Sequence, residues 1–202
     1  MELYRVVNTV FTSNSYVLSE SNDEAILIDV GDFIPIKQYL ETYRKKIKGV
    51  FLTHTHYDHI YGIRDLVKAY PGCKVYTSAF GKEALASDRL NFSRYHNDAF
   101  RWQYEYLQVL QDGDRVEVFP GVNLEVLATP GHDKSCLSYR IGHYLFSGDS
   151  FIPQVKVMAS FPQSNKEDAQ SSVQKILSVT DGCCLCPGHG NVYENFKVSE
   201  YS

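Results

Sequence analysis

The sequence lacks the long uncharged hydrophobic runs that a membrane protein needs. Nowhere do about 18 apolar residues follow one another without a charge, and Glu2, Arg5 and Glu20 lie near the beginning of the chain. We therefore expect neither a transmembrane helix nor a secretory signal peptide. Linkers are lacking too, because proline, glycine and serine are scattered without any low-complexity block. This pattern predicts one domain over residues 1–202.

A strong excess of either charge is also missing. The 20 Lys and Arg residues nearly balance the 24 Asp and Glu residues, which leaves a formal net charge of −4. Such a chain has no general attraction to nucleic acid or to an anionic membrane, so we expect a small-molecule substrate. Its oligomeric state is left open.

The cysteines do not form the pattern of a disulfide framework. There are five of them, an odd number, and Cys183, Cys184 and Cys186 crowd into one apolar stretch. Reduced, buried thiols explain this arrangement better than disulfides or a metal role do. We therefore expect a cytoplasmic protein.

Hydrophobic periodicity divides the chain into two similar halves, each with strands first and helices afterwards. The predicted strands of the first half are Leu3–Val7, Ser15–Ser19, Ala25–Asp29, Gly49–Leu52 and Lys74–Thr77, and its helices are Ile34–Tyr43 and Ile60–Ala69. The predicted strands of the second half are Arg115–Val118, Asn123–Ala128, Ser138–Ile141, Tyr144–Ser147 and Cys183–Cys186, and its helix is Lys166–Ser178. This order indicates an α+β fold of two mixed sheets stacked face to face with helices outside.

An aromatic-rich segment, residues 79–111, lies between the halves. It contains Phe92, Trp102 and Tyr104 among several others. One interpretation is a pair of helices that pack their apolar stripes on the core. The other is a helical lid, part of which overhangs the active site or forms a wall for the substrate.

Three histidines and an aspartate follow the predicted strand Gly49–Leu52 directly. They are His54, His56, Asp58 and His59, within Thr-His-Thr-His-Tyr-Asp-His. Imidazole and carboxylate ligands together suit zinc, iron or manganese, and so tight a cluster can serve two ions. A chance surface cluster is the alternative.

Three more candidate ligands occupy equivalent places, each in a turn after a predicted strand. His132 ends Thr-Pro-Gly-His, Asp149 ends Ser-Gly-Asp, and His189 lies in Pro-Gly-His-Gly. A glycine precedes each of them and allows a sharp turn of the backbone. Packing alone does not explain four strand ends that all deliver His or Asp.

Together, these four motifs in this order resemble the metallo-β-lactamase superfamily, and in particular its glyoxalase II-like (hydroxyacylglutathione hydrolase-like) branch. The resemblance covers nearly the whole chain and implies a four-layer αβ/βα sandwich. Glyoxalase II enzymes often carry a further helical domain, whereas this sequence ends at residue 202, shortly after His189. We therefore expect a compact, single-domain member.

The resemblance implies a ligand set for two divalent metal ions, zinc by expectation, with iron or manganese as alternatives. One ion would be held by His54, His56 and His132, the other by Asp58, His59 and His189, and Asp149 would bridge them. A hydroxide between the ions would then attack a thioester or other ester, with Asp58 and Asp149 as the catalytic residues.

Some of the chemistry stays open at this stage. Asp149 stands where true β-lactamases of this fold generally have Cys or Ser, which argues against β-lactam hydrolysis. The main alternative is a persulfide dioxygenase-like oxidoreductase with one iron on His54, His132 and Asp149, while phosphodiester or lactone hydrolysis is less favoured. Substrate contacts are expected from Tyr57, His96 and Lys134; core packing for Tyr57, a structural role for His96 and a solvated loop position for Lys134 are the alternatives.

Overall fold

Two β-sheets organise the chain in the computed structural model, which describes residues 1–200. The first sheet has the strand order β1-β2-β3-β4-β5-β6 and the second the order β11-β10-β9-β8-β7. The strands of the first sheet are β1 (Glu2–Val7), β2 (Asn14–Ser19), β3 (Glu24–Ile28), β4 (Lys46–Phe51), β5 (Val75–Ser78) and β6 (Leu107–Leu110). Those of the second are β7 (Arg115–Phe119), β8 (Val122–Ala128), β9 (Leu137–Ile141), β10 (Tyr144–Gly148) and β11 (Cys184–Pro187).

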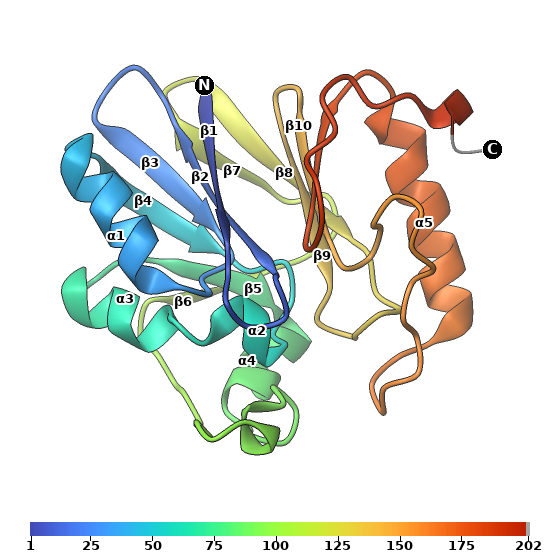
Figure 1. Ribbon diagram of the computed structural model, residues 1–202, viewed down its shortest axis with the longest axis horizontal. Coiled ribbons are helices and arrows are strands. Elements are labelled where there is room, and N and C mark those ends of the chain that lie inside the picture. Colours follow the sequence, from blue (N-terminus) through green and yellow to red (C-terminus); the bar gives the residue numbers. More distant parts are fainter. Residues whose placement is uncertain (201–202) are drawn as a thin grey trace.

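Helices cover the outer faces of both sheets. On the first sheet lie α1 (Phe33–Thr42) and α3 (Ile63–Ala69), and on the second lies α5 (Lys166–Thr180), at the opposite side of the molecule (Figure 1). The remaining helical elements are short: α2 (Tyr57–Ile60), α4 (Ala79–Leu85), and the 3-10 turns η1 (Ser93–Tyr95) and η2 (Val198–Glu200). The expected α+β sandwich, with helices outside two facing mixed sheets, is confirmed.

Alternating side chains on the strands build the layers. In β3, Ala25 and Leu27 face the cluster that includes Ile36 of α1, whereas Ile26 and Ile28 belong to the cluster between the sheets. Because side chains alternate along a strand, one strand buries both of its faces. A third cluster joins Ile176 of α5 to the outer face of the second sheet.

Strand direction brings the predicted ligands to one edge of this sandwich. Strands β3, β4, β5 and β6 are parallel neighbours, as are β10 and β11, so their carboxyl ends lie together. Backbone hydrogen bonds connect the two sheets at this edge: the Leu137 N–H donates to the Thr53 carbonyl (2.7 Å) and the Asn14 N–H to the Gly188 carbonyl (2.6 Å). The site is thus fixed by main chain from both halves.

The expectation of two helices within residues 79–111 is wrong. Only α4 is an α-helix there, and Leu107–Leu110 pairs with β5 as the edge strand β6. Polar side chains hold the stretch between them in an irregular path, because the Ser93 hydroxyl accepts from the Phe100 N–H (2.9 Å) and Asn91 donates to the Phe100 carbonyl (3.2 Å). These bonds satisfy backbone groups that a helix would otherwise satisfy.

Two expectations from composition can be compared with the structure. All five cysteines are buried and free, as the apolar stretch around Cys184 indicated. Within residues 1–200, no helix is both long enough and apolar enough to cross a membrane.

Candidate metal centre

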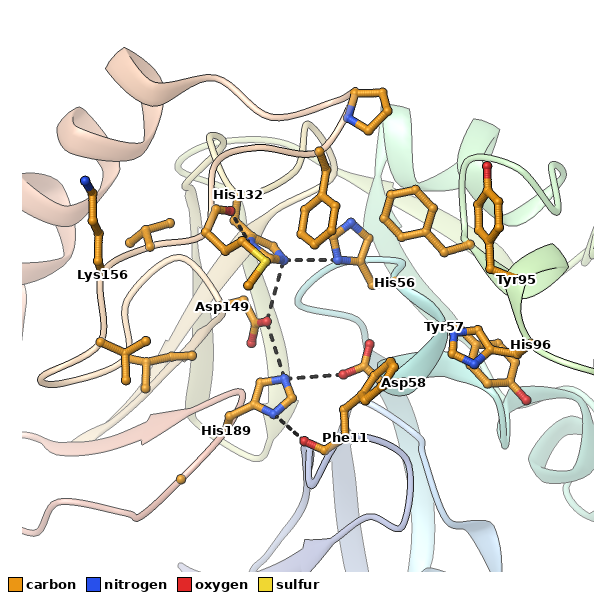
Figure 2. A pocket seen from close by; sticks show the side chains of 18 residues that line it. Phe11, His56, Tyr57, Asp58, Tyr95, His96, His132, Asp149, Lys156 and His189 are labelled. Carbon is orange, nitrogen blue, oxygen red and sulfur yellow. Dashed lines mark hydrogen bonds and ion pairs between the residues drawn. The ribbon is translucent and has the colours of Figure 1, made fainter.

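Seven side chains from four strand ends converge at the edge of the sandwich. Figure 2 shows His56, Asp58, His132, Asp149 and His189 pointing toward one another across a cavity. His54 and His59 lie deeper and are fully buried. The structure thus brings together the complete set of expected ligands.

The first triad consists of His54, His56 and His132, whose ligand atoms all lie within 4.8 Å of one another. His54 and His56 follow β4 and His132 follows β8. The Nε2 atom of His132 is 3.0 Å from the Nδ1 atom of His56. Nε2 of His54 is buried and has no hydrogen-bond partner.

The second triad consists of Asp58, His59 and His189, again with ligand atoms within 4.8 Å. Asp58 and His59 lie in α2, the short helix that begins right after His56. The Asp58 Oδ2 atom is 3.4 Å from Nε2 of His59 and 3.3 Å from Nε2 of His189. Like that of His54, the Nε2 atom of His59 is buried without a hydrogen-bond partner.

Asp149 lies between the two triads. Its Oδ2 atom is 3.5 Å from Nε2 of His132 and 3.4 Å from Nε2 of His189, while its Oδ1 atom is 3.6 Å from Nε2 of His59. Two glycines shape the backbone around it. Gly148 takes a positive φ of 51°, and a Cβ on Gly188 would meet Asp149 Oδ1 at 2.1 Å.

Hydrogen bonds donated by the outer ring nitrogens fix how His54 and His132 face the centre. The Thr53 hydroxyl donates to Asp29 (2.7 Å), so it accepts from Nδ1 of His54 (3.1 Å). The Met158 carbonyl can only accept, and therefore Nδ1 of His132 donates to it (2.8 Å). In both rings the lone pair of Nε2 is left directed inward.

The outer nitrogens of His189 and His59 also donate hydrogen bonds, whereas His56 has another orientation. Nδ1 of His189 donates to the Phe11 carbonyl (3.1 Å), and Nδ1 of His59 donates to the carboxylate of Asp29 (2.9 Å). His56 is turned the other way, with Nε2 3.4 Å from Asp133 Oδ2 and Nδ1 facing His132. Outer partners of this kind fix the tautomer of metal-binding histidines.

These observations fit a pair of metal ions. Two donor atoms at about 2.0–2.1 Å from a tetrahedral ion lie about 3.3 Å apart. The spacings of 3.3–3.6 Å around Asp149 and Asp58 match that value. Each of the five histidines presents one ring nitrogen to the centre, and those of His54 and His59 have no hydrogen-bond partner, an arrangement that bound cations would satisfy.

Ionisation differs between the two triads. Burial, together with the neighbouring His59 and His56, holds the pKa of His54 well below its usual value. Burial opposes the charged form of His59 as well, but Asp58, Asp29 and Asp149 outweigh it and raise its pKa to about 9. In His189, hydrogen bonds to Asp149 and Asp58 likewise outweigh burial and raise the pKa to about 10. His54 thus presents a neutral ring, whereas His59 and His189 hold protons that a cation would displace.

Asp149 itself stays ionised. Burial raises the pKa of its carboxyl group, but the hydrogen bond from His189 and the charge of His59 outweigh burial and hold the pKa well below the usual value. Asp58 behaves in the same way, with a lowered pKa. Two carboxylates therefore face the centre at neutral pH.

A cavity of about 790 Å³ opens above this cluster. The rings of Tyr57 and His96 stack on each other (4.2 Å between centroids) and line one side, where the Tyr57 hydroxyl donates to Asp98 rather than reaching the cluster. Lys134 is exposed, lies 5.8 Å from the Phe80 ring centroid, and is not among the residues that line the cavity. The structure therefore brings two of the three expected substrate residues to the cavity.

Sequence reasoning missed several neighbours of the cluster. Asp29 was assigned only to a strand, and its contact with His59 depends on β3 and β4 being parallel neighbours. Asp133, which lies 3.4 Å from Nε2 of His56, was assigned no role. The segment 151–162, which supplies much of the cavity wall, carries no motif at all.

Comparisons with known proteins agree with this geometry. The family profile of the Metallo-beta-lactamase superfamily matches residues 8–189. A hydroxyacylglutathione hydrolase from Klebsiella pneumoniae is 26% identical over 184 residues, which is 91% of this chain but 64% of that relative. The chain thus spans less than two thirds of the length of this relative.

Solved structures share the fold over nearly the whole chain. The BLEG-1 B3 metallo-beta-lactamase superposes with a TM-score of 0.86 at 24% identity, covering 95% of this chain and 93% of that one. TTHA1623 in a di-iron-bound form superposes with a TM-score of 0.83 at 22% identity, covering 98% of both chains. At these identities the likeness concerns the fold. With its profile match, its sandwich and its converging ligand motifs, the chain belongs to the metallo-β-lactamase superfamily.

Proposed function

We propose that this protein is a hydrolase of thioesters or related esters that works with two divalent metal ions, zinc by preference. The observation that carries the proposal is the position of Asp149, whose two oxygens lie 3.4–3.6 Å from histidine nitrogens of both triads. A single tetrahedral ion takes four ligands, fewer than the seven side chains that converge here, whereas two ions that share a carboxylate can be coordinated by all seven.

Each triad would hold one ion. His54, His56 and His132 would bind the first, and Asp58, His59 and His189 the second, with Asp149 between them. Two divalent cations at this place would lower the pKa of water toward neutrality and polarise a substrate carbonyl oxygen.

The chain's own residues supply position and charge. Asp58 and Asp149 both line the cavity and both remain carboxylates at neutral pH, so they can accept a hydrogen bond from an attacking water molecule. The carbonyls of Met158 and Phe11 hold His132 and His189 in place. Groups fixed in advance cost no reorganisation when the reaction occurs.

The relative from Klebsiella pneumoniae supports ester-type chemistry, since it is named a hydroxyacylglutathione hydrolase and matches 91% of this chain. TTHA1623 supports the use of two ions on this fold, because its structure is of a di-iron-bound form.

The test joins metal content to turnover. We expect about two zinc ions per chain after reconstitution, thioester hydrolysis that a thiol-reactive chromophore records, and its loss on chelation. Asp149→Ala and His56→Ala should abolish turnover and lower the metal content while the circular dichroism spectrum stays the same. Full activity in either variant would contradict the proposal. One iron per chain together with oxygen uptake would instead indicate the oxidoreductase on His54, His132 and Asp149.

A further inference from the structure

The wall of the cavity beyond the ligand cluster is apolar. It is built from three loops: the β1–β2 loop, the stretch between α4 and β6, and the segment between β10 and α5. The apolar side chains that these loops place on the cavity are Phe11, Phe92, Tyr95, Ile152, Val155, Val157, Met158, Phe161 and Pro162. We call this set the apolar wall.

Several members of the apolar wall are open to solvent. Tyr95 and Phe11 are 69% and 66% exposed, which makes them the most exposed large hydrophobic side chains in the described part of the chain. Val155 and Met158 are each 57% exposed. Large apolar side chains gathered at the mouth of one cavity are typical of a binding site.

The apolar wall reaches the metal-ligand cluster itself. The ring centroids of Phe92 and Phe161 lie 4.7 Å and 5.2 Å from that of His56. Phe161 also lies 5.5 Å from His132, and the two phenylalanines are 5.3 Å apart. A carbonyl group placed at the cluster would therefore have its neighbouring substituent against these rings.

Charged partners for a polar substrate are scarce here. Among the cavity-lining residues that the structure describes, Lys156 alone is a lysine or arginine. Figure 2 shows it at the edge of the cavity, apart from the histidines and carboxylates. Glutathione carries carboxylates at both ends, an ammonium group and peptide bonds, and burying such groups without partners is costly.

We infer that the substrate bears a bulky apolar group, an alkyl chain or an aromatic ring, next to its scissile thioester or ester bond, and that it is not a glutathione thioester. The inference rests on the hydrolase function proposed above. The apolar group would pack on the apolar wall, with Phe92 and Phe161 closest to the reacting carbonyl and Val155 and Met158 toward the mouth.

Two series of simple thioesters test this inference on the zinc-loaded protein. One series carries acetyl, butanoyl or hexanoyl groups on N-acetylcysteamine, and the other carries an acetyl group on ethanethiol, butanethiol or hexanethiol. Each buried methylene contributes a factor of up to about four. We expect kcat/KM to rise at least about tenfold from the shortest to the longest member of one series, and the longest to surpass S-lactoylglutathione.

Substitutions in the apolar wall test whether it causes the dependence of kcat/KM on chain length. Val155→Asn and Met158→Gln put polar groups into the apolar wall at exposed positions, where they disturb the fold little. Both should reduce the ratio of kcat/KM between the longest and shortest substrates. Val109→Asn is the matched control, because Val109 is 48% exposed on β6 and does not line the cavity. It should leave the ratio unchanged.

A binding measurement keeps this inference separate from the proposed function. The neutral apolar dye Nile red should fluoresce with the wild-type protein and the Val109→Asn control, and less with Val155→Asn or Met158→Gln. If no thioester is hydrolysed but the dye pattern holds, the proposed function fails and the apolar site stands. Turnover without any chain-length dependence, a preference for S-lactoylglutathione, or equal dye binding in all variants would overturn the inference.

Discussion

Asp29 offers the sharpest test of how the second triad is organised. This residue follows β3, is 1% exposed, and takes a left-handed φ of 57° that asparagine also tolerates. Its Oδ1 atom accepts from the Thr53 N–H (2.7 Å), and its Oδ2 atom accepts from the Thr53 hydroxyl (2.7 Å) and from His59 Nδ1 (2.9 Å). In Asp29→Asn the amide oxygen can still accept from the Thr53 N–H. The amide NH₂ group, however, then faces two donors, the Thr53 hydroxyl and His59 Nδ1.

The size of the effect follows from the lost hydrogen bond to His59. A hydrogen bond to a charged group contributes about 1.5–3 kcal/mol, which corresponds to about 10- to 100-fold in affinity. Loss of an outer partner of a metal-binding histidine weakens metal binding by the same factor of about 10–100. We therefore expect the zinc Kd of the second triad to rise by about one to two orders of magnitude.

Zinc titration in competition with a chromophoric chelator measures this change. Asp23→Asn is the matched control, because Asp23 is an exposed carboxylate paired with Lys46 on the surface, and it should leave both zinc affinities unchanged. Thr53→Val should weaken zinc binding too, since it removes the hydroxyl that holds Asp29 and His54. A melting curve of the metal-free protein verifies that each variant folds. Wild-type zinc affinities in folded Asp29→Asn would refute the reasoning.

Three further predictions concern the cluster. His189→Ala should leave about one zinc ion per chain instead of two, as elemental analysis would record, and retention of both would contradict the ligand assignment. Gly188→Ala should lower metal content and turnover together, because its Cβ would lie 2.1 Å from Asp149 Oδ1; unchanged zinc binding would argue against it. In the metal-free protein, the raised pKa values of His59 (about 9) and His189 (about 10) contribute stability below about pH 6.5 that is lost as pH rises through 9 to 10. With chelator present, the Tm should fall as the pH rises from about 6.5 to 10. A Tm that stays constant over this range would show that the pKa of neither ring is raised by folding.

The same protonation bears on how metal is taken up. His54 presents a neutral ring, whereas His59 and His189 would have to lose protons before they could bind a cation. Binding of the second ion should therefore strengthen as pH rises toward 9, because protons compete for its ligands.

The ligand motifs were readable from the sequence because each is local. His54, His56, Asp58 and His59 lie close together in residues 54–59, and His132, Asp149 and His189 each follow a strand with a recognisable apolar pattern. The alternation of apolar side chains likewise indicated the strands of both sheets, and their helical spacing indicated the main helices. The prediction of two helices in residues 79–111 failed because side-chain hydrogen bonds, such as that between Ser93 and Phe100, set the path of this segment, and such bonds leave no periodic pattern in the sequence.

The sequence alone indicated which side chains gather at this site and the fold that carries them, because the His and Asp motifs and the strand periodicity are both encoded in short segments. Only the tertiary structure decided what surrounds them. The contact of Asp29 with His59 depends on which strands are neighbours, and the apolar wall depends on three loops that meet from distant parts of the chain. Such contacts arise from packing between elements, which no local pattern records.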